Sequence, residues 1–157
     1  MHRVFLIAVS LAFLLTAQAR GQERQWSLDT INEQVFLVFG VPESDDVGLS
    51  FWCTIGKSKV QAFLPETVAA IHPGEVITIG VDIDGHSEKI LGKVARDGGS
   101  QKLTVETVFG LTGSLMKALR AGQSLGINVK GHISSFPITD ANFDGLVDAC
   151  NGIDPAG

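Results

Sequence analysis

Short segments in which apolar and polar residues alternate, each closed by a turn rich in Gly, Asp or Pro, set the main constraint on the fold. The clearest is Glu75–Ile83, in which a β-branched apolar residue occupies every second position from Ile77 onward. An alternation with period two is typical of a β-strand with one buried face. Asp84-Gly85 follows at once, and this pair is favoured in type I′ turns, where both central residues have positive φ. The chain is therefore predicted to form antiparallel β-hairpins.

Similar segments recur along the chain. Leu49–Ile55 and Val60–Leu64 flank a turn at 56–59 and predict a second hairpin. Val35–Phe39 is a continuous apolar run bounded by Gly40 and predicts a buried strand. Further extended segments are expected at Lys89–Val94, Leu103–Val108, Leu125–Val129 and Gly131–Ile138.

Two segments change to helical spacing. In 112–121 the apolar residues Leu115, Met116 and Leu119 share one face; Thr112 or Ser114 is suited to cap the start, and Gly122 to end the helix. The second helix is expected at 140–151. The predicted fold class is mostly β: an antiparallel β-sandwich or half-barrel of about seven to eight short strands, with two short helices at about 112–121 and 140–151.

The N-terminus has the three parts of a secretory signal. A positive Met1–Arg3 precedes the uncharged apolar run Val4–Thr16, and Ala17-Gln18-Ala19 provides a small-x-small cleavage pattern. The apolar run is shorter than the roughly 20 residues that a spanning helix needs. We therefore expect residues 1–19 to be a cleaved signal peptide and the mature chain to be exported, periplasmic or secreted, without a membrane span. The expected organisation of the mature chain is a flexible 20–25, a single β-domain over 26–151 and a tail at 152–157.

The charge balance is mildly acidic, with 17 acidic and 12 basic residues. No run of Lys and Arg provides the electrostatic footprint that nucleic acids or anionic lipids require. We therefore expect the partner to be a protein or another envelope component, and not a nucleic acid.

Cys53 and Cys150 are the two cysteines of the chain, and both lie in the part expected to be exported. An even pair outside the cytoplasm is most simply a disulfide, which would close a loop of nearly the whole domain. The alternative is a reactive or metal-binding pair, but neither cysteine has a C-x-x-C partner or a nearby His.

The segment Asp140–Asp148 reads D-x-N-x-D-G-x-V-D, which resembles part of a calcium-binding loop. Asp140, Asn142, Asp144 and Asp148 would provide oxygen ligands, and Gly at position six permits a sharp turn. Asn151 occupies position twelve, where a bidentate acid is expected, and an extended segment precedes the loop in place of a helix. Calcium is the cofactor this site would take; otherwise no cofactor is expected.

The same residues also fit a helix. If Asp140 is the N-cap, Phe143, Leu146, Val147 and Cys150 form one apolar face at helical spacing, with Cys150 directed inward. We favour this interpretation, and the calcium site remains the alternative.

No motif of a serine hydrolase, a zinc enzyme or a nucleotide-binding loop is present, so we expect no catalytic residue. A hydrolase built from dispersed acids is kept as an alternative. The acids concerned are Glu43, Asp45, Asp46, Asp82 and Asp84. Trp52 and Phe63 lie opposite the inward-facing positions of their hairpin and are candidates for a binding surface.

Four motifs follow one another between residues 48 and 150: an L-x-F-x-C strand, a P-G…D-G turn unit, an L-M-x-x-L-x-x-G helix end and a terminal F-x-x-L-V-x-x-C helix. Their residues are Leu49, Phe51, Cys53; Pro73, Gly74, Asp84, Gly85; Leu115, Met116, Leu119, Gly122; Phe143, Leu146, Val147 and Cys150. In this layout the chain resembles small exported proteins of proteobacterial cell envelopes, the invasion-associated locus B family and the VasI-like proteins. The resemblance implies an envelope β-sandwich and carries over no catalytic residue.

The function expected from the sequence is that of an exported, non-enzymatic binding or structural protein of the bacterial cell envelope. The two alternatives are a calcium-binding exported protein that uses the Asp140–Asp148 loop, and an envelope hydrolase.

Overall fold

The computed structural model describes residues 23–64, 70–96 and 102–153. The expected signal peptide at 1–19 and most of the tail lie outside these residues. The elements, in chain order, are β1 (Gln25–Ile31), β2 (Gln34–Gly40), β3 (Val47–Thr54), β4 (Lys59–Leu64), β5 (Val76–Ile83), β6 (His86–Arg96), β7 (Leu103–Gly110), α1 (Ser114–Ala121), β8 (Ser124–Val129), β9 (His132–Pro137) and α2 (Phe143–Cys150).

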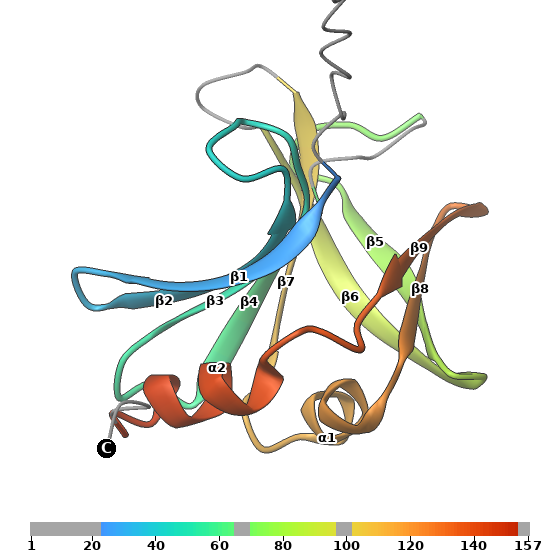
Figure 1. Ribbon diagram of the computed structural model, residues 1–157. Coiled ribbons are helices and arrows are strands. Elements are labelled where there is room, and N and C mark those ends of the chain that lie inside the picture. The colour runs from blue at the N-terminus through green and yellow to red at the C-terminus, as the bar shows by residue number, and fades with distance from the viewer. Residues whose placement is uncertain (1–22, 65–69, 97–101, 154–157) are drawn as a thin grey trace, which may run out of the picture.

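The strands form one antiparallel sheet in the order β1-β2-β3-β4-β7-β6-β5-β8-β9. The sheet curls into a half-barrel, so that its two edge strands approach each other (Figure 1). At this seam the indole Nε1 of Trp26 on β1 donates a hydrogen bond of 2.6 Å to the carbonyl oxygen of Pro137 on β9. The rings of Phe39 and Phe136 meet edge to face at 6.0 Å across the same seam. Side chains therefore join edges that no backbone ladder connects in the described structure.

The predicted fold class is confirmed, in its half-barrel form, with nine strands in the described residues where about seven or eight were expected. The additional strand is β1, which was not expected because most of its residues are polar or exposed. Only Trp26 and Leu28 turn toward the interior, while Ser27 and Asp29 face outward. An edge strand with one half-buried face gives too few apolar positions for a clear alternation.

The hairpin turns follow from local backbone geometry. Asp84 and Gly85 have φ values of 51° and 86°, which confirms the expected turn with two positive φ angles between β5 and β6. Lys130 and Gly131 between β8 and β9 have nearly the same values, 50° and 88°. This second turn was not expected, because Lys is not among the residues favoured at a positive φ.

The core lies inside the half-barrel, and both helices cover one of its ends (Figure 1). Helix α1 buries Leu115, Met116 and Leu119, as its spacing predicted. It begins at Ser114, with Gly113 as N-cap, so the expected cap by Thr112 or Ser114 is wrong. The hydroxyl of Ser114 instead donates to Glu88 Oε1 at 2.7 Å. In the described residues, no helix has both the length and the apolar character needed to cross a membrane.

Candidate functional site

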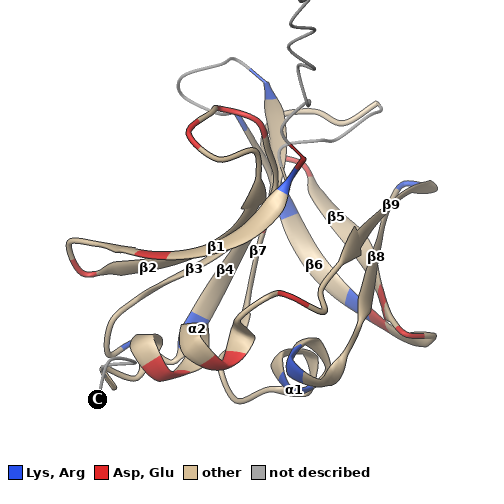
Figure 2. Cartoon of the chain, viewed as in Figure 1, with Lys and Arg blue, Asp and Glu red and all other residues tan. Residues whose placement is uncertain are grey.

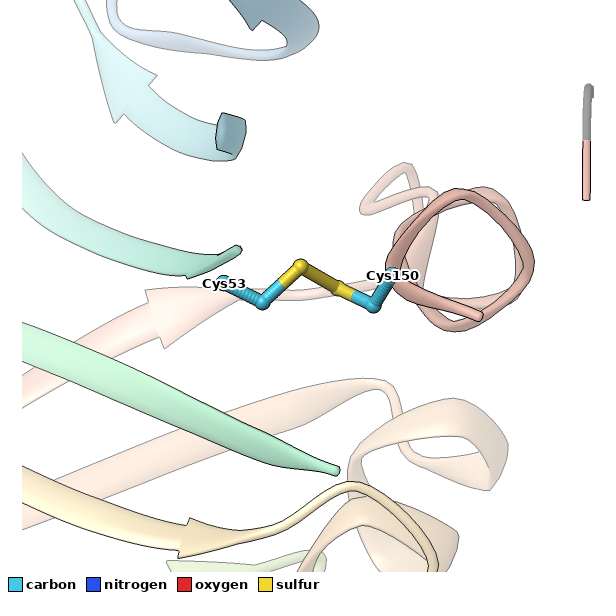
Figure 3. Close-up of a disulfide and its surroundings, with 2 residues drawn as sticks. All are labelled: Cys53 and Cys150. Atoms are coloured by element: carbon cyan, nitrogen blue, oxygen red, sulfur yellow. A yellow bond between two sulfur atoms is a disulfide. The ribbon is translucent and has the colours of Figure 1, made fainter. Parts of the chain in front are cut away.

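A disulfide joins Cys53 on β3 to Cys150 in the last turn of α2, as predicted (Figure 3). The two Cα atoms are 5.9 Å apart, and the residues are separated by 97 positions in the chain. Both cysteines are buried, with 1% and 0% of their surface exposed. The bond therefore attaches the C-terminal helix to the middle of the β1–β4 half of the sheet.

The segment proposed as a calcium loop forms the start of helix α2. The helix begins at Phe143 and ends at Cys150, and its N-cap is Asn142, whose Oδ1 accepts a 2.9 Å hydrogen bond from the Gly145 backbone N–H. The helix expected at about 140–151 is confirmed with narrower limits, while the expected cap by Asp140 is wrong, because the cap lies about half a turn later. The cause is a tight turn before the helix, in which the Ala141 N–H donates to the Ile138 carbonyl.

The four residues considered as calcium ligands do not share one site in the structure. Asn142 caps the helix, and Asp144 forms an ion pair with Arg120 of α1. Asp144 and Asp148 lie on the helix, four positions apart, and not in a loop that converges on one point. Within residues 23–64, 70–96 and 102–153, no three His, Cys, Asp or Glu side chains form a group able to hold a metal ion. The helical interpretation is confirmed, and calcium binding remains an untested alternative.

Replacing Asn142 by Ala should lower the free energy of unfolding by about 1 kcal/mol, because the Gly145 N–H loses its side-chain acceptor at the helix start. Urea unfolding of the oxidised protein measures this loss. Asp140→Ala is the matched control and should change stability by much less. If Asp140→Ala is instead the more costly change, and calcium raises the melting temperature of the wild type only, the segment binds the ion and the capping interpretation is wrong.

The acids of the hydrolase alternative occupy opposite ends of the molecule. Figure 2 shows the acidic β2–β3 loop at one end and the acidic β5–β6 turn at the other. Asp46 accepts hydrogen bonds from Arg24, which holds the pKa of its carboxyl below the ordinary value. The pKa of Asp82 is lowered by hydrogen bonds from the Ser87 hydroxyl and the Gly85 N–H. Asp84 accepts from the backbone of Gln123 and Ser124. Asp46, Asp82 and Asp84 thus serve as hydrogen-bond acceptors that hold local structure.

The inside of the half-barrel is filled. The hollow within it measures about 20 Å³ and is lined almost entirely by apolar side chains, among them Leu49, Ile79 and Leu125. This is room for about one water molecule. This hollow is therefore too small for a ligand of ordinary size.

The outer face of β2, β3, β4, β7 and β6 carries a patch of apolar side chains. Trp52 and Phe63, the two predicted surface aromatics, both lie here, half-buried, on the side opposite the buried Cys53 and Leu64. Trp52 is paired with Phe36 across the β2–β3 ladder, and their rings stack with centroids 6.2 Å apart. We call this surface the outer apolar patch. Its apolar members are Phe36, Trp52, Phe63, Leu91 and Val108, and the polar Gln61 of β4 lies between Trp52 and Val108.

Two members of the outer apolar patch are strongly exposed. Leu91 has 68% and Val108 54% of its surface accessible; on neighbouring strands, Leu91 precedes Gly92 and Val108 follows Thr107, which are paired. Beside Val108 lies a hollow of about 340 Å³, which also includes Lys57 and Lys59 of the β3–β4 turn region. Sequence reasoning found only the two aromatics, because Phe36 joins them through the β2–β3 pairing, and Val108 and Leu91 through the β4–β7 and β6–β7 pairings.

No protein-family model matches the chain, and no curated protein matches its sequence. Among solved structures, the fold is similar to that of invasion associated protein B from Bartonella henselae, with 16% sequence identity and a TM-score of 0.43. The match covers 83% of this chain and 92% of that one.

Proposed function

We propose that this chain is an exported binding protein of the bacterial cell envelope, without chemistry of its own, that holds a partner protein on its outer apolar patch. The observation that carries the proposal is the exposure of Leu91 and Val108 on the same outer face as the stacked Phe36 and Trp52, from which Gln61 of β4 separates them. An extended apolar surface is costly to keep in water, and on folded proteins such patches mark interaction sites.

Two features support the exported location. The N-terminal residues 1–19 have the pattern of a signal peptide. The buried Cys53–Cys150 disulfide suits a protein that folds in an oxidising compartment, since disulfides rarely persist in the cytoplasm.

The composition of the patch favours a protein partner. Stacked aromatics combined with exposed aliphatic side chains are typical of the centre of a protein interface, where aromatic residues contribute most of the binding energy. Lys57 and Lys59 lie beside the patch in the Val108 hollow and form a charged rim, which would favour an acidic border on the partner.

The proposal is tested by site-specific photo-cross-linking in the bacterium that encodes the protein. A photo-reactive phenylalanine is placed at Phe63 or at Val108, and, as the control, at Ser27 on the outer face of β1. We expect both patch positions to give a cross-linked product of the same mass with the same partner, and Ser27 to give none. Absence of a product at both patch positions, or an equal product at Ser27, would contradict the proposal.

Leu91→Ser in the same experiment separates binding from folding. The side chain is 68% exposed, so we expect a change in folding stability within about 0.5 kcal/mol. If the Leu91 side chain is buried in the interface with the partner, its removal should weaken partner binding at least about tenfold, as expected for the loss of a large aliphatic contact. An unchanged cross-linking yield would exclude the patch as the site of contact.

A further inference from the structure

A second outer surface, distinct from the outer apolar patch, is hollowed into a groove of about 760 Å³. It lies over β6, β5, β8 and β9, which are consecutive in the sheet. In Figure 1 these four strands make up the right-hand part of the half-barrel. We call it the β5/β8 groove. Several polar side chains in its lining, and its volume, which lies in the range of small-molecule sites, distinguish it from the apolar patch.

The register of the strands explains the hollow. On the two central strands, Gly80 and Gly126 stand where outward side chains would fill the surface. The long side chain of Lys89 on β6 is paired with Gly80 and forms one wall. Ile133 on β9 is paired with Asn128, is 68% exposed, and forms the other wall. The groove is therefore one side chain deep along its floor and is bounded by longer residues.

The fold does not require Gly126. Its φ lies outside the positive range, and no register shift interrupts the ladders of β8 with β5 and β9. A Cβ built on it would lie 3.5 Å from Asp82 Cβ, an ordinary contact. A glycine inside a strand weakens the strand, and such a glycine often marks a place where a ligand or another backbone approaches closely.

The floor of the groove offers side-chain groups and no free main chain. β5 and β8 are interior strands, and their ladders pair them on both sides. An extended peptide is usually captured through main-chain hydrogen bonds at a sheet edge, which this floor does not provide. What it provides are hydroxyl, carboxamide and carboxylate groups, from Ser87, Asp82, Ser124, Asn128 and Ser135.

These polar groups are arranged to receive hydroxyls. The Asp82 carboxylate is oriented by the Ser87 hydroxyl at 2.7 Å and the Gly85 N–H at 3.0 Å, and it retains acceptor capacity, since a carboxylate has about four lone-pair sites. The hydroxyls of Ser124 and Ser135 form no side-chain hydrogen bond with any other described residue. The charged residues of the lining are Lys89, Asp82 and Glu88, one cation and two acids, so the groove does not favour an acidic ligand.

We propose that the β5/β8 groove is a binding site for a neutral oligosaccharide. The sugar rings would lie over Gly80 and Gly126, where no side chain keeps them from the sheet. Their hydroxyls would bond to Asp82, Asn128 and Ser135, and Ile133 would contact the apolar ring edge. This site does not depend on the partner proposed for the outer apolar patch, so either proposal can fail alone.

The test is an NMR titration of the full, oxidised, exported protein labelled with 15N, using cellotetraose and chitotetraose as probes and tetra-alanine as the peptide comparison. We expect saturable shifts confined to the amides of the groove, with dissociation constants of about 1 mM, typical of weak saccharide binding. Gly126→Val fills the floor and should weaken binding at least tenfold. Ser50→Val, which places the same side chain on the outer face of β3, should leave it unaltered.

Ile133→Ser serves as a second variant, because its exposed side chain is not needed for folding. It should weaken binding several-fold even if Gly126→Val unfolds the protein. Absence of saturable shifts with both saccharides up to about 10 mM, equal shifts in Ile133→Ser, or saturation by tetra-alanine in place of the sugars would overturn the proposal.

Discussion

Removal of the Cys53–Cys150 bond is expected to lower the free energy of unfolding by about 4 to 5 kcal/mol. The bond closes a loop of 97 residues, and the chain-entropy model assigns such a loop a stabilisation of this size. The loss approaches the whole stability of many small domains. The double variant Cys53→Ala with Cys150→Ala should therefore be partly unfolded at ambient temperature, as measured by urea titration followed by circular dichroism.

Reduced wild-type protein is the matched control, because it loses the bond and keeps both side chains. It should show most of the same destabilisation, and hydrogen exchange should accelerate first in α2, which the bond attaches to β3. An unchanged unfolding midpoint after complete reduction would show that packing of α2 alone holds it in place.

The second large effect is expected for Phe143→Ala. Phe143 is 2% exposed and begins α2. Its ring lies 5.1 Å from that of Phe51 on β3 and 6.0 Å from that of Trp26 on β1, centroid to centroid. Truncation removes a contact that joins the helix to two strands and leaves a cavity, which for a buried Phe costs about 3 to 5 kcal/mol.

Thermal and urea unfolding measure the cost, and the fluorescence of Trp26 should shift as its surroundings open. Phe63→Ala provides the comparison, since that ring lies half-buried on the outer face. We expect Phe63→Ala to lower the free energy of unfolding clearly less than Phe143→Ala does. Equal losses in the two variants would mean that the interior relaxes around the missing ring, and that Phe143 does not hold the helix to the sheet.

The elements with strong periodicity could be predicted from the sequence. Ile77, Ile79 and Val81 determine a strand with one buried face, and Asp84-Gly85 determines the turn after it. The apolar face of α2 and the pairing of the two cysteines also followed from spacing and number. These features are local, or involve the only available partner, so the sequence contains enough information to fix them.

The order of the sheet and the two candidate surfaces could not be predicted. β4 pairs with β7 and β5 with β8, and no local pattern identifies such partners. The outer apolar patch and the β5/β8 groove both depend on this order: Val108 meets Gln61, and Gly126 meets Asp82, only through these ladders. The cap of α2 was missed for a smaller reason, because Asp140 and Asn142 are equally good caps and the turn at Ala141 decides between them.

The seam between β1 and β9 determines when folding can finish. Trp26 and Pro137 are 111 positions apart, so the half-barrel cannot acquire its last contact until nearly all of the described chain is available. Folding rates fall as contacts become more distant in sequence. A chain delivered N-terminus first would therefore emerge with the β1 edge uncovered. The rings of Trp26 and Phe39 would then lack their partners on β9. A chain in this state is prone to pair with other chains. A chaperone that binds incompletely folded chains would therefore have most effect before β9 reaches β1.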